Sequence, residues 1–138
     1  MIAATEKRLL QAAILLSGAF SLGFATLSVI RGADVLLRGD LPIFVNVDSH
    51  FRYLSGIFLG VLVALYGCVP GIEHKGPRFR LLGALIICGG LARLAGMLAG
   101  EVPGQGHLVG LGLELLVTPT LLLWQARIAR RMGGTSGG

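Results

Sequence analysis

The sequence predicts an all-α membrane protein, a bundle of four transmembrane helices with both chain ends in the cytoplasm and a long outer loop between the first and second helices. Three observations predict this fold. The chain of 138 residues is 54% hydrophobic and only 14% charged, whereas about a quarter of the residues in soluble domains are charged. The apolar residues form four runs, and the basic residues lie in short clusters between them.

Each apolar run has a length that suits one membrane crossing, because a helix needs about 20 residues, with a range of about 17–25, to span the hydrocarbon core. A helix also satisfies its own backbone in lipid, which an open strand does not. We therefore predict one membrane domain over residues 1–132 and a disordered Gly/Ser-rich tail over residues 133–138. The four runs are Leu9–Ile30, Tyr53–Val69, Leu81–Ala99 and His107–Trp124.

The basic residues predict the orientation of these helices. With the N-terminus inside, eight of the twelve Lys and Arg residues lie in inside segments, three lie outside and Arg93 lies within a span. Cytoplasmic loops carry an excess of Lys and Arg, so we expect a multi-pass protein of the bacterial inner membrane. The inside residues are Lys7, Arg8, Lys75, Arg78, Arg80, Arg127, Arg130 and Arg131, and the outside residues are Arg31, Arg38 and Arg52.

The net charge of +5 does not predict nucleic-acid binding. Short basic clusters beside apolar runs suit anionic lipid headgroups, and the sequence has no basic stripe with interleaved aromatic residues. Small residues at four-residue spacing, such as Gly56 with Gly60, predict close packing between helices of the bundle.

Arg93 and Glu114 are ionisable residues within predicted spans, and such residues are costly in lipid. Arg93 lies about 9 Å, and Glu114 about 10 Å, from the outer ends of their spans at a rise of 1.5 Å per residue. Because the two spans are antiparallel neighbours, the charges reach the same depth in the outer half. We expect them to form an ion pair.

Further polar residues lie near the outer ends of the spans, and together they predict a charged pocket between the second, third and fourth helices. Such a pocket favours ligand binding, although a buried ion pair can also serve only to fix helix register. The predicted ligand-binding residues are Arg52, Arg93, Glu114, Asp48, His50, Glu101, His107 and Thr118.

Enzyme and metal chemistry have little support in the sequence. Asp48, His50, Glu101 and His107 match no known metal-ligand spacing, and no nucleotide, haem or hydrolase motif is present. We therefore predict no cofactor, no metal and no catalytic residue.

Four segments resemble a family of bacterial membrane proteins called domain of unknown function 4345. They are DSHFRYLSGIFLG from Asp48, PRFRLLG from Pro77, GGLARL from Gly89 and ELLVTP from Glu114, and the likeness ends in LLLWQARIARR from Leu121. The resemblance implies a four-helix membrane protein and draws attention to Arg52, Arg93 and Glu114. It implies no particular activity.

We expect a small, non-enzymatic membrane protein that binds an amphiphilic ligand or serves as an accessory subunit of a larger membrane complex or homo-oligomer. One alternative is a small proton-coupled or anion transporter, in which Arg93 attracts the anion and Glu114 exchanges a proton. Another is a membrane isomerase that acts on a lipid-like substrate with Glu114 as acid or base.

Overall fold

A computed structural model describes residues 2–36, 44–100, 102 and 104–133. These residues form helices joined by turns and include no strand, and four of their helices are long and apolar enough to cross a membrane. The all-helical class and the four potential spans predicted from the sequence are therefore confirmed. The elements are α1 (Ile2–Arg31), the 3-10 helix η1 (Gly32–Val35), α2 (Val45–Tyr66), α3 (Gly76–Leu98), α4 (Gln105–Gly112), the π-helical turn η2 (Leu113–Val117) and α5 (Thr118–Gly133).

The helix bounds differ from the apolar runs because polar residues also form helical turns. Helix α2 begins at Val45, well before Tyr53, and its first turn carries Asp48, a charge that the positive end of the helix dipole favours. Part of the predicted outer loop is therefore helix. Residues 37–43 of that loop, and residues 134–138 of the predicted tail, lie outside the described residues.

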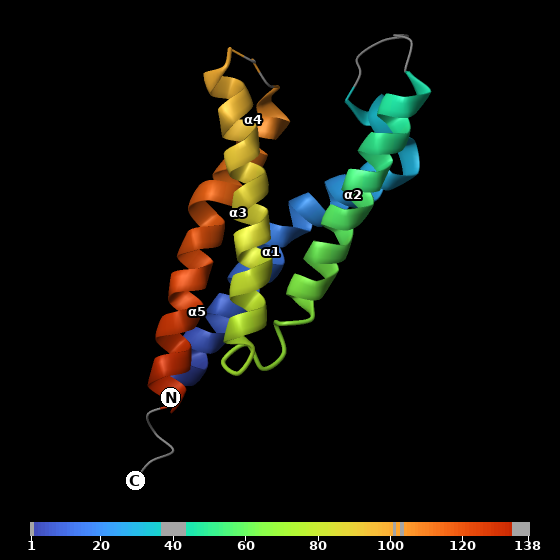
Figure 1. Ribbon diagram of the computed structural model, residues 1–138. Coiled ribbons are helices and arrows are strands. Elements are labelled where there is room, and N and C mark those ends of the chain that lie inside the picture. The colour runs from blue at the N-terminus through green and yellow to red at the C-terminus, as the bar shows by residue number, and fades with distance from the viewer. Residues whose placement is uncertain (1, 37–43, 101, 103, 134–138) are drawn as a thin grey trace.

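The helices form two arms. The first arm contains α1, η1 and α2, and the second contains α3 and the continuous span made by α4, η2 and α5. The arms meet where α1 contacts α5 and α2 contacts α3. Figure 1 shows α2 leaning away from α3 toward the end opposite the chain termini.

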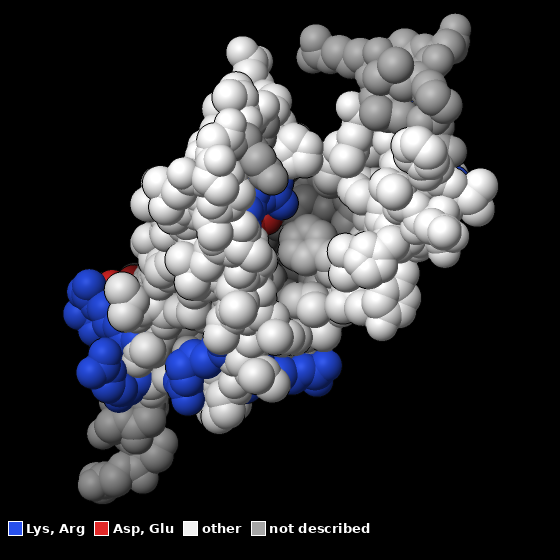
Figure 2. All heavy atoms as spheres, turned by 45° about the horizontal axis from the view of Figure 1, so that its top comes forward, with Lys and Arg blue, Asp and Glu red and all other residues white. Residues whose placement is uncertain are grey.

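We call the end that holds the start of α1, the connection between α2 and α3 (residues 67–75) and the end of α5 the basic end. Lys and Arg side chains gather there, as Figure 2 shows. The opposite end is called the cavity end. The buried core lies mainly toward the basic end and includes Leu10, Ile14, Leu62, Leu65, Cys68, Ile72, Phe79 and Ile128.

The spacing of Gly56 and Gly60 predicted close packing of α2 against another helix, but α2 makes no close contact at these glycines. A Cβ atom at Gly56 or Gly60 would meet nothing within 4 Å, because both glycines face outward. In α3, a Cβ atom at Gly90 would lie 2.8 Å from the Glu114 side chain. Gly90 is thus the glycine that lets α3 approach the turn carrying Glu114.

Candidate ligand-binding site

An ion pair joins α3 to η2 at the cavity end. Nη2 of Arg93 donates to Oε1 of Glu114 at 3.2 Å, as the equal depths of the two residues predict. Nη1 of Arg93 lies 2.7 Å from Nδ1 of His107. Because a guanidinium only donates, Nδ1 of His107 is the acceptor in this contact and the imidazole is neutral. Three polar side chains therefore form one connected group.

The two members of the ion pair differ in exposure. Glu114 is 8% exposed, whereas the Arg93 side chain is 33% exposed. Oε2 of Glu114 is buried and has no hydrogen-bond partner among the described residues. A buried carboxylate oxygen without a partner is unfavourable, so the group is incomplete on the Glu114 side.

A cavity of about 490 Å³ lies between the two arms beside this group. Figure 2 shows the hollow, with basic and acidic atoms inside it. The first arm supplies its aromatic wall, so α1 contributes to a pocket that the sequence placed between the second, third and fourth helices. The lining residues of the first arm are Phe20, Ser21, Phe24, Val35, Leu36 and Phe58, and those of the second are Arg93, Gly104, Gln105, Gly106, His107, Gly110 and Glu114.

Two smaller cavities also reach the ion pair. One, of about 130 Å³, lies between α2 and α3 and is lined by Phe58, Leu85, Gly89 and both members of the pair, among others. Leu85 is half exposed on the outside of the bundle. The other is narrow and mostly apolar, at about 40 Å³, and it runs from Glu114 toward the core. Glu114 therefore lines all three spaces, and Arg93 lines the two larger ones.

The π-helical turn Leu113–Val117 positions Glu114. Pro119 follows it, and proline has no N–H to continue an α-helical ladder and clashes with the preceding turn. A wider turn relieves that clash, and Oγ1 of Thr118 donates to the carbonyl of Leu113 at 2.9 Å. Such π turns often occur at functional sites. A proline within a helix is expected to kink it, but the residue pattern does not predict this widened turn.

Asp48 and Arg52 lie away from the ion pair and bind the end of α1. Nη1 of Arg52 donates to the carbonyls of Val29 and Ile30 at 2.8 and 2.6 Å. Nε of Arg52 donates to Asp48 at 2.7 Å, and Asp48 accepts from the backbone N–H of Ala33 at 2.7 Å. The final carbonyls of a helix have no partner within it, so these side chains cap α1.

Gly32 permits this cap. Its φ of +67° is a conformation that other residues rarely adopt, and a Cβ atom there would lie 2.6 Å from Nη2 of Arg52. His50 is exposed one turn into α2, with its ring 6.5 Å from that of Tyr53. Asp48, His50 and Arg52 thus do not line the three cavities described.

The other predicted residues have different positions. Thr118 lines the narrow apolar cavity rather than the large one, and Glu101 lies outside the described residues. His107 lines the large cavity, with its ring edge toward Phe24 at 6.4 Å between centroids. The described residues contain no group of three or more His, Cys, Asp or Glu side chains arranged to bind a metal ion.

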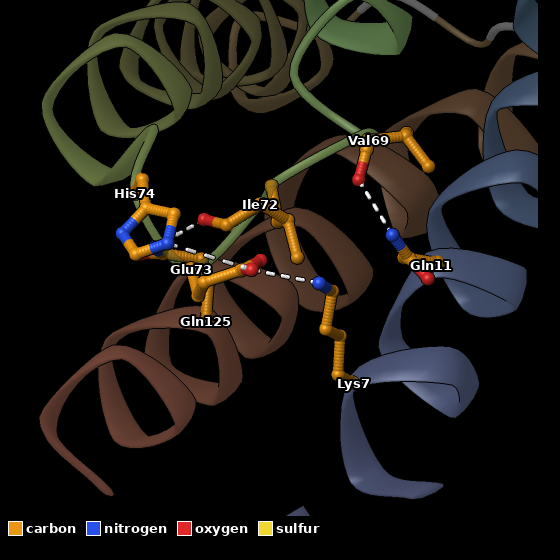
Figure 3. A network of polar contacts seen from close by, with 7 residues as sticks. All are labelled: Lys7, Gln11, Val69, Ile72, Glu73, His74 and Gln125. Carbon is orange, nitrogen blue, oxygen red and sulfur yellow. Dashed lines mark hydrogen bonds and ion pairs between the residues drawn. The ribbon is translucent and has the colours of Figure 1, made fainter. Parts of the chain in front are cut away.

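A second polar network, at the basic end, ties the connection between α2 and α3 to α1 and α5 (Figure 3). Nζ of Lys7 donates to Oε1 of Glu73 at 2.7 Å. Nε2 of Gln11 donates to the carbonyl of Val69 at 2.7 Å, and Nε2 of Gln125 donates to that of Ile72 at 2.9 Å. The sequence predicts Lys7 to lie on the inside, but it does not predict this network.

Burial raises the pKa of Glu73, but the hydrogen bond from Lys7, with further help from the backbone and nearby positive charge, outweighs it and holds the pKa below its ordinary value. Oε2 of Glu73 and Oε1 of Gln125 are also buried without partners among the described residues. Neither residue lines one of the three cavities. This network is therefore structural, in contrast to the group around Arg93.

Residues 9–125 match the family described as domain of unknown function 4345, and the chain belongs to that family. The match includes all or most of each of the four membrane-length helices, and it contains Arg93, His107 and Glu114. The resemblance inferred from the short motifs is thus confirmed over most of the chain. No curated protein and no solved structure shows significant similarity to it.

Proposed function

We propose that this protein is a multi-pass membrane protein that binds one amphiphilic molecule between its two arms. One observation carries the proposal. An ion pair between the one-third-exposed Arg93 and the buried Glu114 borders a cavity of about 490 Å³ whose other wall is mainly apolar and aromatic. Sites for small molecules typically have about 300–1,000 Å³, mostly apolar walls and a few convergent polar groups.

The arrangement suits an amphiphile better than a wholly polar solute. Phe20, Phe24 and Phe58 offer apolar surface for a hydrocarbon chain, while Arg93 and Glu114 offer contacts for a polar headgroup. The smaller space between α2 and α3 reaches the same pair from the outside of the bundle, where Leu85 is exposed. This space supports a route for a lipid-like molecule to enter sideways from the bilayer.

The test places a side chain in the cavity without removing a polar group. A Cβ atom at Gly110 would lie 3.6 Å from Nη1 of Arg93, whereas one at Gly112 would meet nothing within 4 Å. Gly110→Leu should therefore displace the amphiphile, and Gly112→Leu, which adds the same side chain two residues away, should leave it bound.

Native mass spectrometry from mild detergent measures the retained molecule. We expect the wild type and Gly112→Leu to retain one amphiphile per chain, with strong loss in Gly110→Leu. Equal retention by both variants, or no retained molecule in the wild type, would contradict binding in this cavity. A stable complex with another protein instead of a small molecule would favour the accessory-subunit alternative.

We further propose that the basic end faces the cytoplasm, in the bacterial inner membrane, so that the cavity lies in the outer half of the bilayer. Eight of the twelve basic residues lie in segments assigned to the inside, and an excess of basic residues marks cytoplasmic segments. The transporter and isomerase alternatives stay predictions, because no described contact favours either over simple binding.

Labelling of single cysteines with an impermeant reagent tests this orientation, in a chain whose Cys68 and Cys88 are replaced by alanine. Lys75→Cys lies at the basic end, and Val102→Cys is an exposed position at the cavity end. In intact cells we expect position 102 to react and position 75 to be protected until the membrane is permeabilised. The reverse pattern would invert the proposed orientation.

A further inference from the structure

The hydrogen-bond donors beside the large cavity specify the charge of the headgroup that it takes. Resting on the amphiphile-binding function above, we propose that the ligand carries an anionic headgroup, a carboxylate or a phosphate, whose oxygens accept hydrogen bonds from Arg93 and His107. The apolar part of the ligand lies against the aromatic wall that the first arm supplies.

Arg93 has donors that its described contacts do not use. A guanidinium carries five N–H groups and accepts no hydrogen bond, and the described contacts of Arg93 go only to His107 and Glu114. Its Nε atom has no partner among the described residues and is not one of their buried unpartnered atoms, so it is open to the surrounding space. The side chain is one-third exposed and lines the cavity, where Figure 2 shows basic atoms. Carboxylate and phosphate oxygens match a guanidinium with two parallel hydrogen bonds.

His107 adds a second kind of donor to the same cavity. Because Nδ1 accepts from Arg93, the neutral ring carries its proton on Nε2. This atom has no partner among the described residues and is not one of their buried unpartnered atoms, so its N–H is free to donate. The His107 ring lines the cavity beside Phe24. Arg93 and His107 therefore both need an acceptor, and an oxyanion supplies several.

The first turn of α4 favours the same charge. Gly104, Gln105 and Gly106 line the cavity, and no side chain caps this end of the helix. The N–H groups of Gln105 and Gly106 have no backbone partner among the described residues, as expected at the start of a helix. The partial positive charge of such an end attracts anions. This turn supports the proposal, which the donors of Arg93 and His107 carry.

Glu114 does not reverse this preference, although its carboxylate is close. Glu114 is 8% exposed, whereas the Arg93 side chain is 33% exposed. Oε1 of Glu114 accepts from Arg93 and Oε2 is buried, so a headgroup in the cavity lies nearer to the donors than to the covered carboxylate, and Coulomb interactions weaken with distance. Among the described residues no other carboxylate lines the cavity. Ser21 and Gln105 also line it, but they can donate or accept and do not select a charge.

The test compares amphiphiles that share one alkyl chain and differ in the headgroup. The wild-type chain in mild detergent is mixed with equal amounts of hexadecanoate, hexadecyl phosphate, hexadecanol and hexadecylamine, at a mildly alkaline pH that ionises the acid. Native mass spectrometry measures how much of each is retained. We expect at least one anion to exceed hexadecanol by about tenfold, the value of one hydrogen bond to a charged group, and hexadecylamine to be retained least. The ranking of the two anions separates a fatty-acid carboxylate from a lipid phosphate.

A negative charge placed in the cavity tests the sign of the headgroup directly. A Cβ atom at Gly106 would meet nothing within 4 Å, so a short side chain fits there. Gly106→Asp should reduce retention of the preferred anion by about tenfold, because its carboxylate repels the headgroup and competes for the same donors. Gly106→Asn, which has the same shape without the charge, should retain the anion at the wild-type level. Equal retention by these two variants would overturn the proposal.

The double variant Arg93→Gln with Glu114→Gln tests the assigned contact. It removes both charges, while the two amides can still hydrogen-bond across the same space. The preference for the anion over hexadecanol should disappear, and hexadecanol should still bind because the aromatic wall is unchanged. A double variant that keeps the preference would overturn Arg93 as the contact for the headgroup. If the double variant does not fold, the two Gly106 variants still decide the sign of the charge.

The outcomes distinguish this proposal from the function on which it rests. Equal retention of all four amphiphiles, or a preference for the alcohol or the amine, would overturn the anionic headgroup but leave amphiphile binding intact. Retention of none would overturn both. Acetate and inorganic phosphate should not displace the retained amphiphile, because they have no chain to contact the aromatic wall; displacement at equal concentration would show that the headgroup alone is the ligand and overturn the amphiphile assignment.

Discussion

At the basic end of the bundle, polar side chains bind backbone atoms of a loop, whereas the Arg93 group at the cavity end joins side chains to one another beside a cavity. Gln11 and Gln125 donate to carbonyls of the connection between α2 and α3, and Lys7 pairs with Glu73 in that connection. The surrounding core is tightly buried. Arg93 of α3 instead contacts His107 of α4 and Glu114 of η2, and all three residues line a cavity of about 490 Å³.

The difference shows that an unpartnered buried atom is not enough to identify a binding site. Both ends contain such an oxygen, in Glu73 and in Glu114. Glu114 differs from Glu73 in that its side chain lines the large cavity together with its partner Arg93. The polar group at the basic end therefore serves mainly the fold, as does the cap of α1 by Asp48 and Arg52, whereas we propose that Arg93 and Glu114 receive a ligand.

The largest effect should come from breaking the ion pair on one side. Glu114→Ala leaves the Arg93 guanidinium without its carboxylate, and removal of one partner from a buried pair typically costs about 3–5 kcal/mol. The double change Arg93→Leu with Glu114→Leu removes both charges and should cost less than Glu114→Ala alone. Thermal unfolding in detergent is measured for the wild type, the two single leucine variants and the double leucine variant. If the stability losses of the two single variants simply add up to that of the double variant, the two residues do not interact.

A smaller loss of stability is expected when the cap of α1 is removed. Arg52→Ala eliminates hydrogen bonds to the carbonyls of Val29 and Ile30 and to Asp48. Because the Arg52 side chain is partly exposed, we expect a loss of about 1–3 kcal/mol. Arg52→Lys should recover little of it, since one ammonium lacks the fork geometry of arginine. Full stability in Arg52→Lys would show that charge alone caps the helix.

The pH dependence of stability should reveal the contact at the basic end. The pKa of Glu73 in the folded protein lies below its ordinary value of 4.5 because Lys7 stabilises the ionised form. The group therefore contributes stability above pH about 4.5, and this contribution is lost as pH falls toward the lowered pKa. Thermal unfolding from pH 7 to 4 should show Glu73→Gln less stable than the wild type by about 1–2 kcal/mol at pH 7.

The difference in stability between Glu73→Gln and the wild type should narrow as the pH falls below about 4.5, because Glu73 is then protonated in the unfolded chain while the folded protein, with its lowered pKa, still holds it ionised. Lys7→Met is a useful companion, since it removes the partner and should also reduce the pH dependence. A constant difference across the range would show that the ion pair makes no contribution linked to protonation.

The sequence predicted the ion pair because depth within antiparallel spans depends only on residue spacing, and the distance of 3.2 Å between Arg93 and Glu114 agrees with it. It misplaced Arg52, because the early start of α2 could not be seen from hydropathy, and that start brings Arg52 to the end of α1. The aromatic wall from α1 was missed for a similar reason. Which face of an apolar helix lines a cavity depends on how the arms diverge, and residue type alone does not encode this.

The most direct test of the central claim uses the double variant Arg93→Leu with Glu114→Leu. Leucine side chains fill similar space but offer no contacts to a headgroup, so the bundle should still fold. Circular dichroism and size-exclusion chromatography check the fold, and native mass spectrometry measures the retained amphiphile. We predict a folded chain that has lost the molecule bound by the wild type, whereas a folded double variant that retains this molecule at the wild-type level would contradict the account.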